Sequence, residues 1–172
     1  MPVLIQRLCG ICPVSHHLCA AKATDIIVGA QSIPVTAEKM RRLMHYGQIY
    51  QSHALHFFHL SSPDLLFGFD ADPLKRNVIG VAMEHPELAR KAILMRKYGQ
   101  EVIKATAGKK VHGTGAIPGG INKSLSAQER DLLKQDSDTM VVWAVEGLEL
   151  FKKLYREDIE RMSSFAAFDS NH

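Results

Sequence analysis

The chain has 172 residues, of which 46% are hydrophobic and 23% charged, with a formal net charge of +3. These values are typical of one globular unit with a sizeable core. The positive charge is too weak and scattered for a nucleic-acid partner, and no apolar run approaches the roughly 18 residues of a membrane helix. The N-terminus lacks a secretory leader pattern, so we expect a cytoplasmic protein with no membrane span.

The first elements flank a cysteine-rich stretch. Residues 3–8 are short and apolar and predict a strand or an extended lead-in. A helix is expected over about residues 16–29. Pro13 is suited to open this helix, because proline fits the first helical position, and Ser15 to cap it.

Two further helices are expected in the middle of the chain. Thr36 is the N-cap predicted for a long helix over about residues 37–60. A turn-rich connector with two prolines follows over residues 61–77. The next helix begins at Pro86 and ends at Gly108, a residue type favoured just beyond a helix end.

A long Gly-rich loop leads into the last predicted helix. Ser126 and Glu129 form the S-x-x-E pattern of a capping box. An amphipathic helix of about ten turns is expected from there, and the chain then ends on FAAFDSNH without a cap or a polar tail. Its apolar stripe comprises Leu133, Met140, Ala144, Leu148, Phe151, Tyr155, Ile159 and Met162. The fold class is therefore mainly α, with long packed helices and Gly-rich connecting loops in one domain over residues 1–172.

The three cysteines lie within eleven positions of one another, at Cys9, Cys12 and Cys19. The spacing of Cys9 and Cys12 allows both sulfurs to bind one ion or to form a small-ring disulfide. Arg7 and a following helix N-terminus would both favour the thiolate, which is the form that binds metal. His16 follows Cys12 by four residues, so one helical turn would bring its imidazole over the Cys12 sulfur.

Several kinds of site fit this stretch. A zinc knuckle would add two ligands from the nearby histidines and Cys19, but the second half-site of structural zinc proteins is missing. A thioredoxin-like dithiol would need alternating strands and helices, whereas the rest of this chain is predicted to be helical. Pro13 directly after Cys12 excludes a c-type haem attachment. Inert buried thiols, or half of a transition-metal site completed from elsewhere, are the remaining interpretations.

The pattern R-x-C-G-x-C-x-x-x-H, formed by Arg7, Cys9, Gly10, Cys12 and His16, resembles the N-terminal metal motif of the [NiFe]-hydrogenase large subunit. The stretches CPVSHHLCAAKA, HALHFFHLSSPDLLFGFDADPLKRN and GKKVHGTGAIPGGINKSLS are similar to its cytoplasmic, NAD-reducing branch. The resemblance covers essentially the whole chain and implies part of the fold of that large subunit.

This resemblance implies a metal site and a reaction. In the family, four cysteines hold nickel, and two of them bridge to an iron that carries CO and cyanide. Cys9 would be a terminal nickel ligand and Cys12 a bridge, both of them catalytic. His16 would donate a hydrogen bond to the Cys12 sulfur. Arg7 would also lie beside the metal ligands without binding the metal. The implied reaction is reversible heterolytic cleavage of H2, with a terminal thiolate as a plausible first base.

The implied partners are a small subunit with iron–sulfur clusters and diaphorase subunits that bind flavin and NAD. The family's second metal motif, Asp-Pro-Cys-x-x-Cys, and its Arg-Gly-x-Glu segment are absent from this sequence. The chain would thus supply half of the cysteine ligands and be an inactive part of a longer subunit. The alternative is a non-enzymatic, truncated metal-binding or assembly-interaction module that uses Cys9, Cys12 and His16.

Other polar residues have simpler interpretations. His53, His56 and His59 cannot all share one helical face, which favours structural or interface histidines over metal ligands. The stretch GTGAIPGG lacks the Lys and Ser that directly follow the last glycine of a Walker loop. The resemblance implies instead a structural loop beside the active site, with Lys109 and His112 as polar contacts of unknown role.

Two further expectations concern apolar packing. Cys19 is expected to be a small buried residue rather than a ligand. The stripe of Leu148, Phe151, Tyr155 and Ile159 is expected to pack in the core of long helices. Part of that stripe would stay exposed if its facing helices belong to another part of a longer subunit, which would favour aggregation or partner binding.

Overall fold

The computed structural model describes residues 1–164, and these residues confirm a mainly α fold. The elements, in chain order, are α1 (Pro2–Ile5), the 3-10 helix η1 (Gln6–Leu8), α2 (Pro13–Ile27), α3 (Val35–Leu55), the π-helix η2 (His56–Ser61), α4 (Ser62–Phe67), α5 (Val78–Glu84), α6 (Pro86–Ala107), β1 (Ala116–Ile117), β2 (Gly120–Ile121), α7 (Ala127–Glu157) and α8 (Ile159–Ser164). The final FAAFDSNH lies outside the described residues. Among the described helices, none is both long and apolar enough to cross a membrane.

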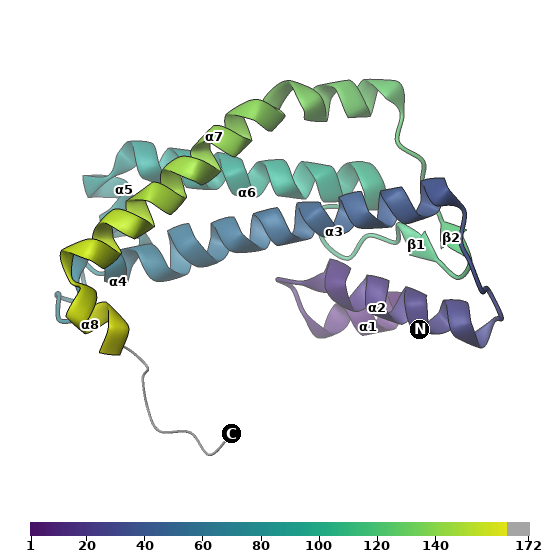
Figure 1. The fold of residues 1–172 in the computed structure, drawn as a ribbon, viewed down its shortest axis with the longest axis horizontal. Helices are drawn as coiled ribbons and strands as arrows, with labels where there is room; N and C mark the ends of the chain where they lie inside the picture. The colour runs from purple at the N-terminus through teal and green to yellow at the C-terminus, as the bar shows by residue number, and fades with distance from the viewer. Residues whose placement is uncertain (165–172) are drawn as a thin grey trace, which may run out of the picture.

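Two long helices, α3 and α6, form the centre of the fold and run antiparallel side by side (Figure 1). α7 crosses them on one side, and α1 and α2 lie on the other side of α3, near the β1–β2 hairpin. One apolar cluster joins α3, η2, α6 and α7, and a second joins α2, α3 and α6. The first comprises Ala54, Phe58, Ala92, Met95 and Met140, and the second Val14, Met44, Ile103 and Ala107.

A buried ion pair fastens the hairpin to α2 and α3. Arg41 donates to the Asp25 carboxylate at 2.6 Å, and the two side chains are only 7% and 11% exposed. Arg41 also donates to the carbonyls of Ile117 and Gly120, while Asp25 accepts from the Gly119 N–H at 2.7 Å. The Gly-rich loop is therefore held at its tip by charges on two helices.

Several predicted boundaries agree with the structure. Ser126 and Glu129 form the reciprocal capping box that begins α7. α6 begins at Pro86, and Gly108 follows its end in the left-handed conformation at φ 84°. These signals depend on neighbouring residues only, which is why the sequence alone reveals them.

The prediction of a strand over residues 3–8 was wrong, because this segment forms α1 and η1. Pro2 occupies the first turn of α1, a position where its missing N–H costs nothing. The next helix also begins earlier than predicted, since Pro13 is its first residue. Its N-cap is Cys12 rather than Ser15.

The helix predicted over residues 37–60 is interrupted by a wider turn. α3 begins at Val35 after Pro34, so Thr36 is not its N-cap, and it passes into the π-helix η2. Pro63 follows that π-helix and has no N–H to offer the preceding turn, which favours a local change of hydrogen-bond pattern. The last helix also breaks, at Asp158, so Ile159 lies on α8 rather than on α7.

Candidate metal centre

The loop between η1 and α2 brings three metal-ligating side chains together. The sulfurs of Cys9 and Cys12 and a ring nitrogen of His16 all lie within 4.8 Å of one another. Cys9 ends η1 in an extended conformation, Cys12 occupies the N-cap position of α2, and His16 lies one turn into that helix. The spacing C-x-x-C-x-x-x-H thus converges because a helix begins directly after the second cysteine.

Hydrogen bonds make the two sulfurs chemically different. Cys9 Sγ accepts from the backbone N–H groups of Cys12 at 3.2 Å and Ile11 at 3.3 Å, and from Cys12 Sγ at 3.1 Å. The Cys12 N–H, its thiol and the Ile11 N–H together lower the pKa of Cys9. The pKa of Cys12 is raised, because its thiol proton is shared with Cys9 and burial disfavours its charge. Cys9 is therefore the sulfur that ionises first in the metal-free protein.

The two other residues of the motif make fewer contacts. The His16 ring is half-buried and forms no side-chain hydrogen bond within residues 1–164. Its donation to the Cys12 sulfur stays a prediction. Arg7 is exposed, and hydrogen bonds rather than the Arg7 charge account for the lowered pKa of Cys9.

The expectation that Cys19 is buried was wrong, because its side chain is exposed. The buried face of α2 carries His17, Ala21 and Asp25, which follow one another at four-residue steps. Cys19 lies two residues beyond His17, a rotation of about 200° around the helix, and so faces away from the core. Its sulfur is not part of the three-residue cluster, as predicted for a residue that is no ligand.

Distant side chains hold the cysteine loop. Sequence reasoning named His112 as a polar contact of unknown role but missed Gln48 and Gln51. Gln48 and Gln51 of α3 each donate to the Ile11 carbonyl at 2.9 Å. His112 lies within hydrogen-bond distance of the Cys9 carbonyl, at 3.0 Å, and its Nε2–H is the donor because a carbonyl only accepts. His112 has a φ of 55°, which is uncommon for a residue with a side chain.

His17 anchors the same region from within α2. Its Nε2 accepts from the Ala116 N–H at 3.0 Å, so Nδ1 carries the proton and donates to the Pro2 carbonyl at 3.3 Å. The side chain is 1% exposed, and burial lowers its pKa. A neutral His17 thus connects α1 and β1. No sequence signal indicates this role, because adjacent His16 carries the recognisable spacing.

His53, His56 and His59, together with Lys109, stand apart from the cluster. His53 donates from Nδ1 to the Ile49 carbonyl of its own helix at 2.9 Å, and His56 is exposed. His59 is half-buried, and burial lowers its pKa. Lys109 is exposed. Within the described residues no second group of possible metal ligands forms, so structural or interface roles for these histidines stay predictions.

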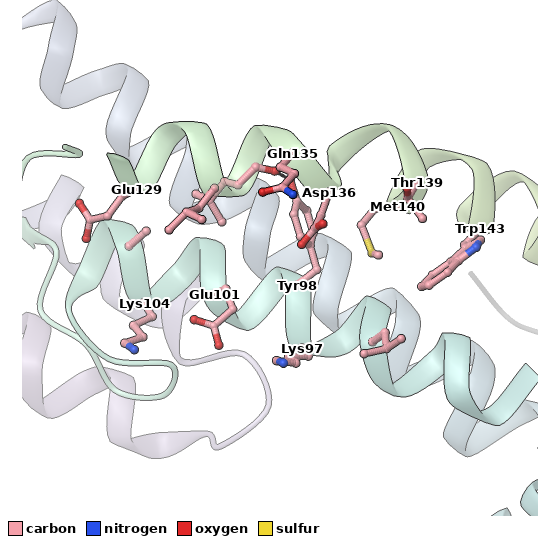
Figure 2. Close-up of a pocket in the computed structure, with 14 residues that line it drawn as sticks. Lys97, Tyr98, Glu101, Lys104, Glu129, Gln135, Asp136, Thr139, Met140 and Trp143 are labelled. Carbon is pink, nitrogen blue, oxygen red and sulfur yellow. Dashed lines mark hydrogen bonds between the residues drawn. The ribbon is translucent and has the colours of Figure 1, made fainter. Parts of the chain in front are cut away.

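A pocket of about 670 Å³ lies between α6 and α7. Figure 2 shows Lys97, Glu101 and Lys104 on the α6 side, with Gln135 and Asp136 on the α7 side. None of its lining residues belongs to the cysteine loop, which lies near α1 and α2. It is therefore not the metal centre.

The chain is similar in sequence to known hydrogenases. Residues 1–79 match the family described as nickel-dependent hydrogenase. A vhu-type subunit of an F420-non-reducing hydrogenase from Methanococcus voltae is 46% identical over 170 residues. The HoxS subunit beta of an NAD-reducing hydrogenase from Cupriavidus necator is 46% identical over 176 residues. The chain is similar to nickel-dependent hydrogenase subunits over almost its whole length.

Solved structures of hydrogenases share the fold. An NAD+-reducing [NiFe]-hydrogenase in the H2-reduced state superposes with a TM-score of 0.95 and 56% identity, covering 98% of this chain and 38% of that one. A [NiFeSe]-hydrogenase from Dm. baculatum gives a TM-score of 0.71 at 22% identity, which supports the fold alone. The resemblance to the [NiFe]-hydrogenase large-subunit fold is confirmed.

The chain spans well under half of the length of these two hydrogenase subunits. The alignments cover 99% and 96% of this chain, but 40% and 36% of the Methanococcus and Cupriavidus subunits. The chain therefore corresponds to less than half of a hydrogenase subunit of that kind.

Proposed function

We propose that this chain contributes half of the nickel–iron site of a hydrogenase that couples reversible H2 oxidation to NAD. The observation that carries the proposal is the convergence of Cys9, Cys12 and His16 within 4.8 Å. The 56% identity to an NAD+-reducing [NiFe]-hydrogenase supports the NAD-linked branch. The chain alone is expected to be inactive.

The donor set fits a nickel–iron centre in part. Thiolates are soft and can bridge two metals, which suits nickel beside iron. Cys9 would be the terminal nickel ligand and Cys12 the bridge, with His16 tuning Cys12 from outside the ligand shell. Two more thiolates, and the CO and cyanide on iron, would come from outside this chain. When bound, the centre supplies the redox and Lewis-acid chemistry for splitting H2.

The protein's own contribution is to hold protons and thiolates in place. Cys9 Sγ, surrounded by two N–H donors, is the site where a proton can be taken up and passed on. In the metal-free chain the thiol of Cys12 donates to Cys9 Sγ at 3.1 Å. That proton would leave when the centre binds, because Cys12 would bridge the metals as a thiolate.

The proposed partners follow from the branch. Electrons would leave through a small subunit with iron–sulfur clusters to diaphorase subunits that bind flavin and NAD. The relative from Cupriavidus necator is named as a subunit of an NAD-reducing hydrogenase, which supports this arrangement. A cytoplasmic location suits an enzyme that exchanges electrons with NAD.

The test begins with the coding DNA on both sides of this segment. An open frame that reaches an Asp-Pro-Cys-x-x-Cys motif would supply the missing thiolates. The enzyme purified from that frame should contain nickel and reduce NAD+ with H2. Both properties should fall at least about a hundredfold in Cys9→Ser and Cys12→Ser, because each removes a ligand. Cys19→Ser is the matched control and should leave both unchanged.

Two results would contradict the proposal. Nickel content and H2-dependent NAD+ reduction that survive both substitutions would remove these cysteines from the reaction. A stop codon after His172, together with tight one-to-one zinc binding that needs Cys9, Cys12 and His16, would favour the non-enzymatic metal-binding module instead.

A further inference from the structure

One peptide unit of the cysteine loop is held at both ends. The carbonyl of Ile11 accepts from Gln48 Nε2 and from Gln51 Nε2, each at 2.9 Å. The N–H of the same peptide unit belongs to Cys12 and donates to Cys9 Sγ at 3.2 Å. Two buried amides of α3 therefore contact one side of a peptide whose other side contacts the Cys9 sulfur.

The geometry of the peptide couples these two ends. A peptide unit is planar, and in its trans form the carbonyl and the N–H point in opposite directions. Fixing the direction of the Ile11 carbonyl therefore fixes the direction of the Cys12 N–H. A hydrogen bond to the carbonyl also polarises the peptide and strengthens the N–H as a donor.

Burial confines the side chains of both glutamines. Gln48 and Gln51 are 2% and 5% exposed and lie three residues apart, on one face of α3. The Oε1 of Gln48 is buried and has no hydrogen-bond partner among the described residues. An unpaired buried acceptor costs folding free energy, and the orientation of Gln48 that donates to the Ile11 carbonyl carries this cost. Turning the amide over would place Oε1 against the Ile11 carbonyl oxygen.

The helix behind Gln51 leaves it little room to move. A Cβ at Gly99 of α6 would lie 2.7 Å from Gln51 Cβ and 2.8 Å from its backbone nitrogen. The close approach of α6 to α3 at Gly99 thus restricts the backbone position of Gln51. The position of the Ile11 carbonyl is set by the central helix pair of the fold.

We infer that Gln48 and Gln51 are positioning residues for the Cys9 thiolate. Through the Ile11–Cys12 peptide they aim an N–H at Cys9 Sγ and so set how much electron density that sulfur gives to a bound metal. This inference rests on the proposed function in taking Cys9 as a metal ligand. Neither glutamine contacts the metal site itself.

The first measurement needs no metal. Amide hydrogen exchange at Cys12 is compared in the reduced chain, in a variant with both Gln48→Met and Gln51→Met, and in Met95→Ala. Met95→Ala is the control. It weakens the apolar cluster that joins α3, η2, α6 and α7, and Met95 does not contact the cysteine loop. The double variant should exchange at least about tenfold faster at Cys12, and the control should match the parent at this amide.

The second measurement uses cobalt(II) as an anaerobic probe of the thiolates. Loss of an N–H···S bond raises the energy of the sulfur electrons, so the sulfur-to-cobalt charge-transfer band should move to longer wavelength in the double variant. Each single variant keeps one donor and should give a smaller shift. Cys9→Ser identifies the part of the band that comes from Cys9.

The two measurements separate the possible failures. If the parent chain binds cobalt without using Cys9, the proposed role of Cys9 as a ligand is wrong, and the exchange result still decides the positioning. If the folded double variant keeps both the parent exchange rate at Cys12 and the parent band, the positioning role of the glutamines is overturned.

Discussion

At the scale of single residues, Asp25 and Arg41 show how a buried charge is made tolerable. Arg41 donates to the Asp25 carboxylate at 2.6 and 3.2 Å and to two hairpin carbonyls. Asp25 accepts a further N–H from Gly119. The charges are therefore paired and hydrogen-bonded on several sides, and removing one partner would leave the other buried and alone.

We predict that Arg41→Met lowers the free energy of unfolding at pH 7 by about 3–5 kcal/mol, the cost of breaking a buried ion pair. Urea denaturation measures it. Arg42→Met is the matched control, because Arg42 forms an exposed pair with Glu38 and its loss should cost less than about 1 kcal/mol. Equal effects of the two substitutions would contradict the role given to the buried pair.

The same pair predicts a pH dependence. The hydrogen bonds from Arg41 lower the pKa of Asp25 in the folded chain, while the unfolded value is about 3.9. Its contribution to stability is therefore present above about pH 4 and is lost as the pH falls through the lowered folded pKa. The difference in unfolding free energy between the parent and Asp25→Asn should be largest near pH 7 and shrink below about pH 4. A difference that grows in acid would oppose this assignment.

At the scale of elements, the crossing of α3 and α6 depends on two glycines. A Cβ at Gly99 would lie 2.7 Å from the Gly47 carbonyl oxygen and 2.8 Å from a backbone nitrogen of α3. A Cβ at Gly47 would mainly meet the Val102 side chain, at 2.8 Å. Backbone atoms cannot turn aside as a side chain can, so the two positions differ in tolerance.

We predict that Gly99→Ala destabilises the chain by about 1–3 kcal/mol, a typical cost of overpacking. The loss should appear although alanine favours a helix over glycine by about 1 kcal/mol. Gly47→Ala should cost less, since Val102 can shift. Thermal and urea denaturation of both variants provide the measurement, and a stabilised Gly99→Ala would show that the helices have room to separate.

At the scale of the whole molecule, apolar surface stays open between α3 and α7. A pocket of about 460 Å³ there includes Ile49, Leu148 and Phe151 in its lining. Leu148 is 50% exposed and Phe151 39% exposed, so the expected apolar stripe of the last helix packs only in part. An open apolar patch of this kind favours association.

We predict that the purified chain binds an apolar fluorescent dye such as anilinonaphthalene sulfonate. Leu148→Glu should lower the dye fluorescence by about twofold, because it places a charge within the patch. Gln128→Glu adds the same charge at an exposed position on α7 outside the pocket and should leave the fluorescence unchanged. Equal fluorescence in all three proteins would mean that the dye binds elsewhere.

The sequence by itself determined what depends on neighbouring residues. The capping box at Ser126, the end of α6 at Gly108 and the spacing of Cys9, Cys12 and His16 are all local patterns, and each appears in the structure where it was expected. Local hydrogen bonds and helix periodicity need no distant partner. The same patterns carried the resemblance to the hydrogenase family.

Only the tertiary structure decided which distant side chains support the metal loop. His112 reaches the Cys9 carbonyl across 103 positions, and Gln48 and Gln51 reach the Ile11 carbonyl across 37 and 40. Arg41 joins Asp25 of another helix, and Cys19 faces solvent because the core lies on the opposite side of α2. No local spacing encodes such pairs, since they form only when packed helices bring separate stretches of the chain together.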